Sequence, residues 1–217
     1  YHSSRGYFVR KTAGLTLAKM GMPFALPAIT PIIIEHNDVS AFSELFKFGN
    51  YYGMIPQIPD ESWYAMMVSQ NGGLGDRVAS FMLQTGKTLP YNLLISYIDE
   101  RCVKNDAAII DAQNILVMSV ISIQGHETEF MRKMENSGRM FNTWGIRVIG
   151  RSGSMNFVPF LLRFLGNVDE SISQESYLAL RSITGMDPAQ ERKLAINNPE
   201  VMYDFKKFYL DMRRTRK

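Results

Sequence analysis

Cationic and aromatic side chains alternate in the middle of the chain. Residues 130–166 hold six bases and one acid, a balance of +5 in a chain whose formal net charge is +3. Bases at such spacing can contact successive phosphates of a nucleic acid, and flat aromatic rings can stack on its bases. The candidate nucleic-acid-binding residues are Arg132, Lys133, Arg139, Arg147, Arg151 and, for base stacking, Trp144. Phe141 and Trp144 lie three positions apart, which is also typical of a core-facing helix side.

Residue patterns for metal binding or catalysis are nearly absent. The histidines are far apart and form no H-x-x-x-H pair: His2, His36 and His126. We therefore expect no metal, no cofactor and no enzymatic activity. An enzyme without a cofactor is an alternative that rests on His126 beside Glu127 and Glu129, although these carboxylates also suit the start of a helix.

The remaining composition is that of a globular protein, with 46% hydrophobic and 21% charged residues. Basic blocks alternate with acidic blocks along the chain, as in a protein that holds a polyanion between subdomains or that self-associates head to tail. Such alternation also occurs on plain solvated surfaces. The single cysteine, Cys102, excludes an internal disulfide and, with no signal-peptide pattern, indicates a reducing intracellular compartment.

The cationic segment follows the most apolar stretch of the chain. Residues 107–124 (AAIIDAQNILVMSVISIQ) have apolar side chains around nearly the whole helical circumference, so we expect one helix buried on most sides. Asn105 or Asp106 would cap it, and Gly125 would end it. The stretch is too short and too polar to span a membrane, so we expect no membrane partner.

Prolines recur every four residues near the N-terminus. Because proline has no N–H and clashes with the preceding helical turn, we expect Met22–Ile34 to run extended. Pro23, Pro27 and Pro31 would then mark an apolar arm, packed either on its own domain or on another copy as an oligomerisation arm.

Helix starts and stops punctuate the rest of the chain. Asp60, Asp187-Pro188 and Asn198-Pro199 mark helix starts, Ser173 would cap a helix over 174–183, and residues 70–75 (QNGGLG) would form a turn. We predict an all-α fold of about nine or ten short helices in one or two lobes. The expected parts are an N-terminal helix and arm (1–34), a helical core with an optional lobe division near 104–126 (35–199), and a C-terminal helix with a basic tail (200–217).

An all-α chain with an extended arm, a basic central segment, a basic tail and no catalytic residues resembles the helical nucleoproteins and coat proteins of RNA viruses. The local likeness is Phe141-Asn142-Thr143-Trp144-Gly145 followed by Arg151-Ser152, which is similar to the C-terminal lobe of rhabdovirus-type nucleoproteins. The resemblance implies a protein that oligomerises and coats single-stranded RNA without sequence specificity, in the virion or host-cell cytoplasm. It also implies that Arg147 and Arg151 contact genome phosphates and that Pro23–Ile34 is an exchanged arm.

A helical protein-interaction module is the competing interpretation. Its groove would be lined by methionines, whose flexible side chains adapt to varied partner shapes. The candidates are Met66, Met67, Met131, Met134 and Met140, although methionine at this density is also common in a plain core. Salt separates the two interpretations, because polyanion binding weakens steeply with ionic strength and binding in an apolar groove hardly responds.

Overall fold

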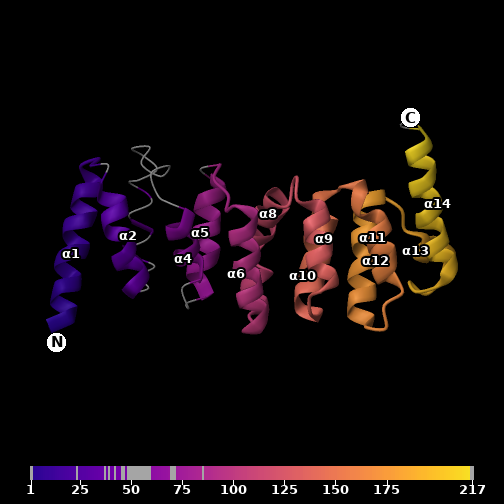
Figure 1. The fold of residues 1–217 in the computed structure, drawn as a ribbon, viewed down its shortest axis with the longest axis horizontal. Coiled ribbons are helices and arrows are strands. Elements are labelled where there is room, and N and C mark those ends of the chain that lie inside the picture. Colours follow the sequence, from indigo (N-terminus) through magenta and orange to yellow (C-terminus); the bar gives the residue numbers. More distant parts are fainter. Residues whose placement is uncertain are drawn as a thin grey trace. The chain divides into compact units, whose positions relative to one another are not determined.

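The computed structural model describes residues 2–22, 24–36, 38, 40, 41, 43, 44, 47, 60–68, 72–84 and 86–215. Every regular element in these residues is helical, which confirms the predicted all-α fold (Figure 1). Two compact units divide the chain, Tyr1–Met118 and Ser119–Lys217, and helix α8 (Gln113–Ser122) runs from one into the other. None of the described helices has both the length and the apolar character that crossing a membrane requires.

The first unit is built from helices that pack on one another in a series of pairwise contacts. They are α1 (His2–Lys19), α2 (Ala25–His36), α4 (Asp60–Val68), α5 (Gly72–Gln84), α6 (Tyr91–Val103) and α7 (Ala107–Ile110). Trp63 and Tyr97 are fully buried in this unit. Arg101 is 2% exposed, and its guanidinium donates through Nη1 to Asp106 at 3.3 Å and through Nη2 to the carbonyl of Met67 at 3.2 Å. The buried charge is thus paired, as burial in an apolar interior requires.

The N-terminal prolines lie in a helix, so the prediction that Met22–Ile34 runs extended is wrong. Pro27 falls in the first turn of α2, where backbone N–H groups have no partner within the helix and proline costs little. Pro31 removes one later hydrogen bond of α2, and close packing of α2 on α1 offsets that loss. Pro23, the third proline of the expected oligomerisation arm, lies outside the described residues.

Helices α1 and α2 approach each other closely. Ile29 of α2 is 1% exposed, and a Cβ on Gly14 of α1 would lie only 2.4 Å from its Cδ1 atom. The glycine therefore creates the space into which the isoleucine packs. Burial of such a side chain stabilises a fold by roughly 1.5–3 kcal/mol, which is comparable with the cost of one proline in a helix.

The apolar stretch 107–124 is two helices rather than the single helix that the sequence predicts. Asp111 and Ala112 separate α7 from α8, and the Ala112 N–H bonds to the carbonyl of Ile109 at 3.2 Å, three residues back. This tighter bond ends α7 after one turn. Asn114, one of the polar residues of the stretch, donates a hydrogen bond to Asp76 of α5 at 3.2 Å. Its side chain thus faces another helix of the first unit.

The glycines expected to form a turn over residues 70–75 lie partly in a helix, because α5 begins at Gly72. A Cβ on Gly75 would lie 3.0 Å from the carbonyl oxygen of Met67 and 3.1 Å from the hydroxyl of Tyr97. The missing side chain lets α5 approach both α4 and α6. Close helix packing, and not a turn, explains this glycine.

The second unit is a row of helical hairpins. Its elements are α9 (Glu127–Glu135), α10 (Arg139–Ser152), the 3-10 turn η2 (Met155–Phe157), α11 (Val158–Leu165), α12 (Glu170–Thr184), α13 (Pro188–Arg192) and α14 (Pro199–Thr215). Helix α12 packs on α10 and α11, and α14 packs on α11 (Figure 1). Pro159 stands in the first turn of α11, directly after η2, where a proline is compatible with the start of a helix. Stacked hairpins of this kind leave grooves between neighbouring helices.

Helix α12 begins four residues earlier than a cap at Ser173 would place it, so that prediction is wrong. Asp169 is the N-cap, and its carboxylate accepts hydrogen bonds from the backbone N–H groups of Ser171 and Ile172 at 3.0 and 3.4 Å. Ser173 is buried inside the helix, where its hydroxyl donates to the carbonyl of Leu165 at 2.5 Å. The serine thereby satisfies the C-terminal end of α11 instead of starting α12.

Candidate functional site

Trp144 lies in the core of the second unit. Its side chain is 1% exposed, and its ring meets Phe130 edge-on at 5.8 Å and Phe141 at 5.1 Å between centroids. Phe130 and Phe141 are themselves buried. Both faces of the indole are therefore covered by protein, so the structure does not support base stacking by Trp144. The spacing of Phe141 and Trp144 marks the core face of α10.

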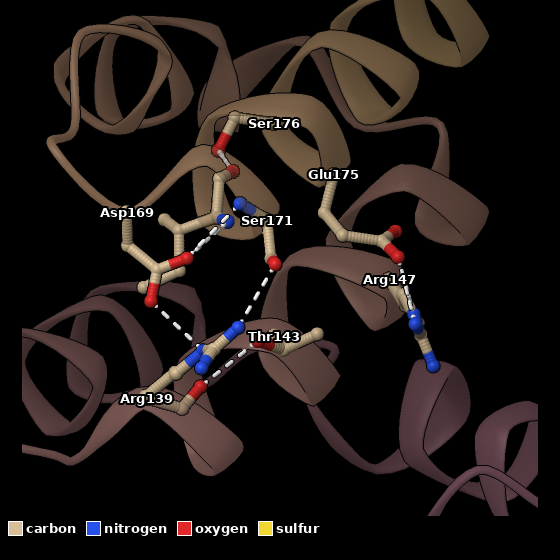
Figure 2. Close-up of polar contacts among 8 residues, drawn as sticks. Arg139, Thr143, Arg147, Asp169, Ser171, Glu175 and Ser176 are labelled. Carbon is tan, nitrogen blue, oxygen red and sulfur yellow. Dashed lines mark hydrogen bonds and ion pairs between the residues drawn. The ribbon is translucent and has the colours of Figure 1, made fainter.

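Two of the candidate arginines tie α10 to α12. Arg139 bonds through Nε to Asp169 at 2.8 Å and through Nη2 to the hydroxyl of Ser171 at 2.9 Å (Figure 2). Arg147 donates to one carboxylate oxygen of Glu175 through Nε at 3.0 Å and Nη2 at 2.7 Å. A phosphate would have to displace these carboxylates, so both arginines have a structural role in the free protein.

The remaining basic side chains of the segment 130–166 differ in whether they have an acidic partner. Arg163 pairs with Glu135 at 2.5 Å, and the Lys133 ammonium lies 5.5 Å from the centre of a buried phenylalanine ring. Arg132 and Arg151 are exposed, and neither has an ion-pair partner within the described ranges. The structure therefore leaves two of the candidate phosphate contacts without a competing carboxylate.

His126, the residue on which an enzymatic role would rest, stands at the surface. Its Nδ1 lies 3.3 Å from Glu129, and the two side chains are 47% and 58% exposed. Water screens a pair this exposed, so the ion pair contributes little to the stability of the fold. Across the part of the chain that the structure describes, no cluster of three metal-ligating side chains forms.

An apolar groove of the second unit lies between α11 and α14 and has a volume of about 500 Å³. Its α11 wall consists of Pro159, Leu162, Arg163 and Gly166. Its α14 wall consists of Met202, Lys206, Tyr209 and Leu210. The α11 residues follow the i, i+3, i+4, i+7 spacing of one helix side. Leu210 is 45% exposed, which gives the groove an open apolar rim.

A second groove of about 460 Å³ lies on the other side of α11, against α9. The lining residues from α9 are Thr128, Met131, Arg132 and Glu135, and those from η2 and α11 are Asn156, Pro159, Phe160 and Arg163. This groove is more polar than its neighbour and contains a carboxylate. Pro159 and Arg163 line both grooves, so they form a ridge between them.

Tyr177 of α12 positions the α14 wall of the apolar groove. Its ring packs edge-on against Phe205 of α14 at 5.7 Å, and its hydroxyl donates to Asp187 and accepts from the Ala189 N–H at 3.2 Å. Asp187 is further held by Arg181 at 3.1 Å. Burial raises the pKa of Tyr177, and the hydrogen bond to Asp187 raises it further, to about 12. This cluster fixes the turn through which the chain reaches α14.

We expect Tyr177→Phe to lower the free energy of unfolding by about 1–2 kcal/mol, because the two hydrogen bonds of the hydroxyl, to Asp187 and from the Ala189 N–H, are lost. The pKa of the folded tyrosine lies above the ordinary value of 10.0. The contribution of the Tyr177 hydroxyl to the free energy of unfolding is therefore fully present below pH 10 and is lost as the pH rises toward 12. Melting curves of both proteins should converge over this alkaline range, and a constant difference in stability would contradict the assignment.

The methionine groove of the competing interpretation does not form as predicted. Met66, Met67 and Met134 are fully buried core residues. Met131 lines the groove between α9 and α11, and Met140 is half-buried. The sequence analysis did not identify the residues of the α11–α14 groove. A signal was present, because Met202 and Tyr209 belong to an apolar face of the last helix that is broader than the face needed to pack on one neighbouring helix.

The chain matches no protein-family model, no curated protein and no solved structure.

Proposed function

We propose that the chain is a helical protein-interaction module that binds an amphipathic helix in the α11–α14 groove. The observation that carries the proposal is the groove itself, which has six uncharged lining residues and an exposed leucine at its rim. Apolar grooves between two helices accept a partner helix through residues at i, i+3, i+4 and i+7. Rows of helical hairpins commonly bind partners along such surfaces.

Charge complementarity supports a peptide with carboxylates beside its apolar side, since the only charges that line the groove are Arg163 and Lys206. The volume of about 500 Å³ is in the range of small-ligand pockets and accommodates several apolar side chains. Partner recognition would thus combine apolar anchors with charged flanks.

Blocking the groove is expected to abolish peptide binding. Gly166 closes α11 with φ −90°, and an added Cβ would meet only the Met202 methyl group at 3.6 Å, an ordinary contact. Gly166→Leu should therefore fold normally, fill one end of the groove and weaken binding of a labelled amphipathic peptide at least about tenfold. Fluorescence anisotropy with the full chain measures the effect.

A matched pair of leucines provides the control. Leu210 and Leu178 are both 45% exposed and lie on helices of the second unit, but only Leu210 lines this groove. Leu210→Glu should weaken binding of an uncharged amphipathic peptide, whereas Leu178→Glu should leave it unchanged. Equal effects of the two substitutions, or no binding by the unaltered protein, would overturn the proposal.

Coating of single-stranded RNA is the second candidate function, in the virion or host-cell cytoplasm as the nucleoprotein resemblance implies. It is favoured by the two exposed arginines without a carboxylate partner in the described part of the chain, Arg132 and Arg151. Oligouridine binding should then weaken steeply with salt and fall in the Arg132→Ala, Arg151→Ala double variant. An oligomeric peak whose 260/280 nm absorbance ratio drops after ribonuclease treatment would support genome coating, and a monomeric peak with a protein-only ratio would oppose it.

A further inference from the structure

The charged side chains that line the α11–α14 groove are all basic. Arg163 and Lys206 line it and no carboxylate does. Lys206 is exposed and has no ion-pair partner among the residues that the structure describes. The acidic residues of α14 are already engaged with arginines, Glu200 and Asp204 with Arg192 at 2.9 and 3.1 Å, and Asp211 with Arg214 at 3.7 Å.

Arg163 stands on the ridge and is held from the neighbouring groove. Its guanidinium bonds to Glu135 of α9 at 2.5 Å, and the two side chains are 66% and 40% exposed. An ion pair this exposed is weak, because water screens it and both side chains lose freedom when they pair. A carboxylate arriving in the α11–α14 groove can therefore replace Glu135.

From this arrangement, and resting on the function proposed above, we propose that the partner is an acidic amphipathic helix. Its apolar side chains enter the α11–α14 groove, and carboxylates on its flank pair with Lys206 and Arg163. Glu135 acts as a resident competitor that occupies Arg163 when no partner is bound. Specificity then arises from the displaced ion pair as well as from the apolar contacts.

Three labelled peptides test the charge preference separately from groove binding. They share one leucine side of about 16 residues and differ only in a polar side of Glu, Gln or Lys. We expect the full chain to bind the Glu peptide most tightly and the Lys peptide least at about 0.15 M salt, with the differences shrinking as salt is added. Binding of the Gln peptide, and its loss in Gly166→Leu, reports on the groove alone.

Two adjacent lysines give a charge-matched pair of variants. Lys206 and Lys207 are both exposed on α14, but only Lys206 lines the groove. Lys206→Glu should weaken the Glu peptide about fivefold or more, while Lys207→Glu should change it less than about twofold. Glu135→Gln should tighten the Glu peptide about two- to fourfold, because Arg163 is released from its competitor.

The outcomes separate the two proposals. Equal binding of the three peptides, or equal effects of the two lysine variants, would overturn the acidic partner and leave groove binding intact. No change in Glu135→Gln would remove the competitor role. If the Gln peptide fails to bind, the groove proposal itself is overturned. If oligouridine displaces the Glu peptide with the same dependence on Lys206, the surface is a general polyanion site, and the acidic helix is rejected.

Discussion

The Trp144→Ala variant is expected to lose the folded second unit. Trp144 is 1% exposed and packs edge-on against Phe130 and Phe141, so its truncation leaves a large cavity beside these two rings. Truncations of this type cost about 3–5 kcal/mol, a large share of the stability of a small domain. Chemical unfolding followed by circular dichroism measures the loss.

Trp144→Phe serves as the matched control for this prediction. The indole N–H of Trp144 is buried without a hydrogen-bond acceptor, so replacing it by phenylalanine forfeits volume but no hydrogen bond. We expect about half of the loss seen for alanine. If Trp144→Ala keeps full stability but weakens RNA binding, the side chain is a stacking surface after all, and the core assignment is wrong.

Gly150→Val is expected to push α10 and α12 apart. A Cβ on Gly150 would lie 3.0 Å from both the Cα and the Cβ of Ala179, so the added atoms meet the backbone of α12 and not a flexible side-chain end. Overpacking of a close helix contact typically costs about 1–3 kcal/mol, and the two branched methyl groups place this variant at the upper end. Hydrogen exchange of the amides of α10 and α12 should speed up together.

Gly6 supplies the opposite case. It lies in α1 with no atom near its missing side chain, so Gly6→Ala should stabilise the chain by about 0.5–1 kcal/mol through helix propensity alone. Gly150→Ala, which faces the 3.0 Å contact, should lack this gain. The same substitution thus separates the effect of helix propensity from that of packing. Equal gains in the free energy of unfolding at both sites would show that the contact between α10 and α12 can accommodate a methyl group.

Helices that begin with a typical capping residue followed by proline could be predicted from the sequence alone. Asn198 illustrates this, because its side chain accepts from the Glu200 N–H at 2.9 Å and proline follows it at the first helical position. The errors arose where packing overrides a local rule. Pro31 is tolerated in α2 because that helix packs tightly on α1, and this contact joins residues that no local pattern relates.

The candidate site was harder to predict, since composition does not say which charges are already paired. Arg139 and Arg147 were sound choices as cations, but their partners Asp169 and Glu175 come from another helix, about 30 residues away in sequence. The groove escaped notice for a similar reason. Its walls come from α11 and α14. From the sequence alone, the apolar residues of each helix that line the groove cannot be distinguished from those that are buried in the core.

The shared ridge of the two grooves has a thermodynamic consequence. Arg163 lines both, and one guanidinium held by a ligand on the α9 side is withdrawn from a ligand on the α14 side. Two acidic ligands that each recruit Arg163 are therefore linked with negative cooperativity. The factor by which the first weakens the second must equal the factor by which the second weakens the first. Competition for this one side chain would then be enough to couple the two adjacent grooves.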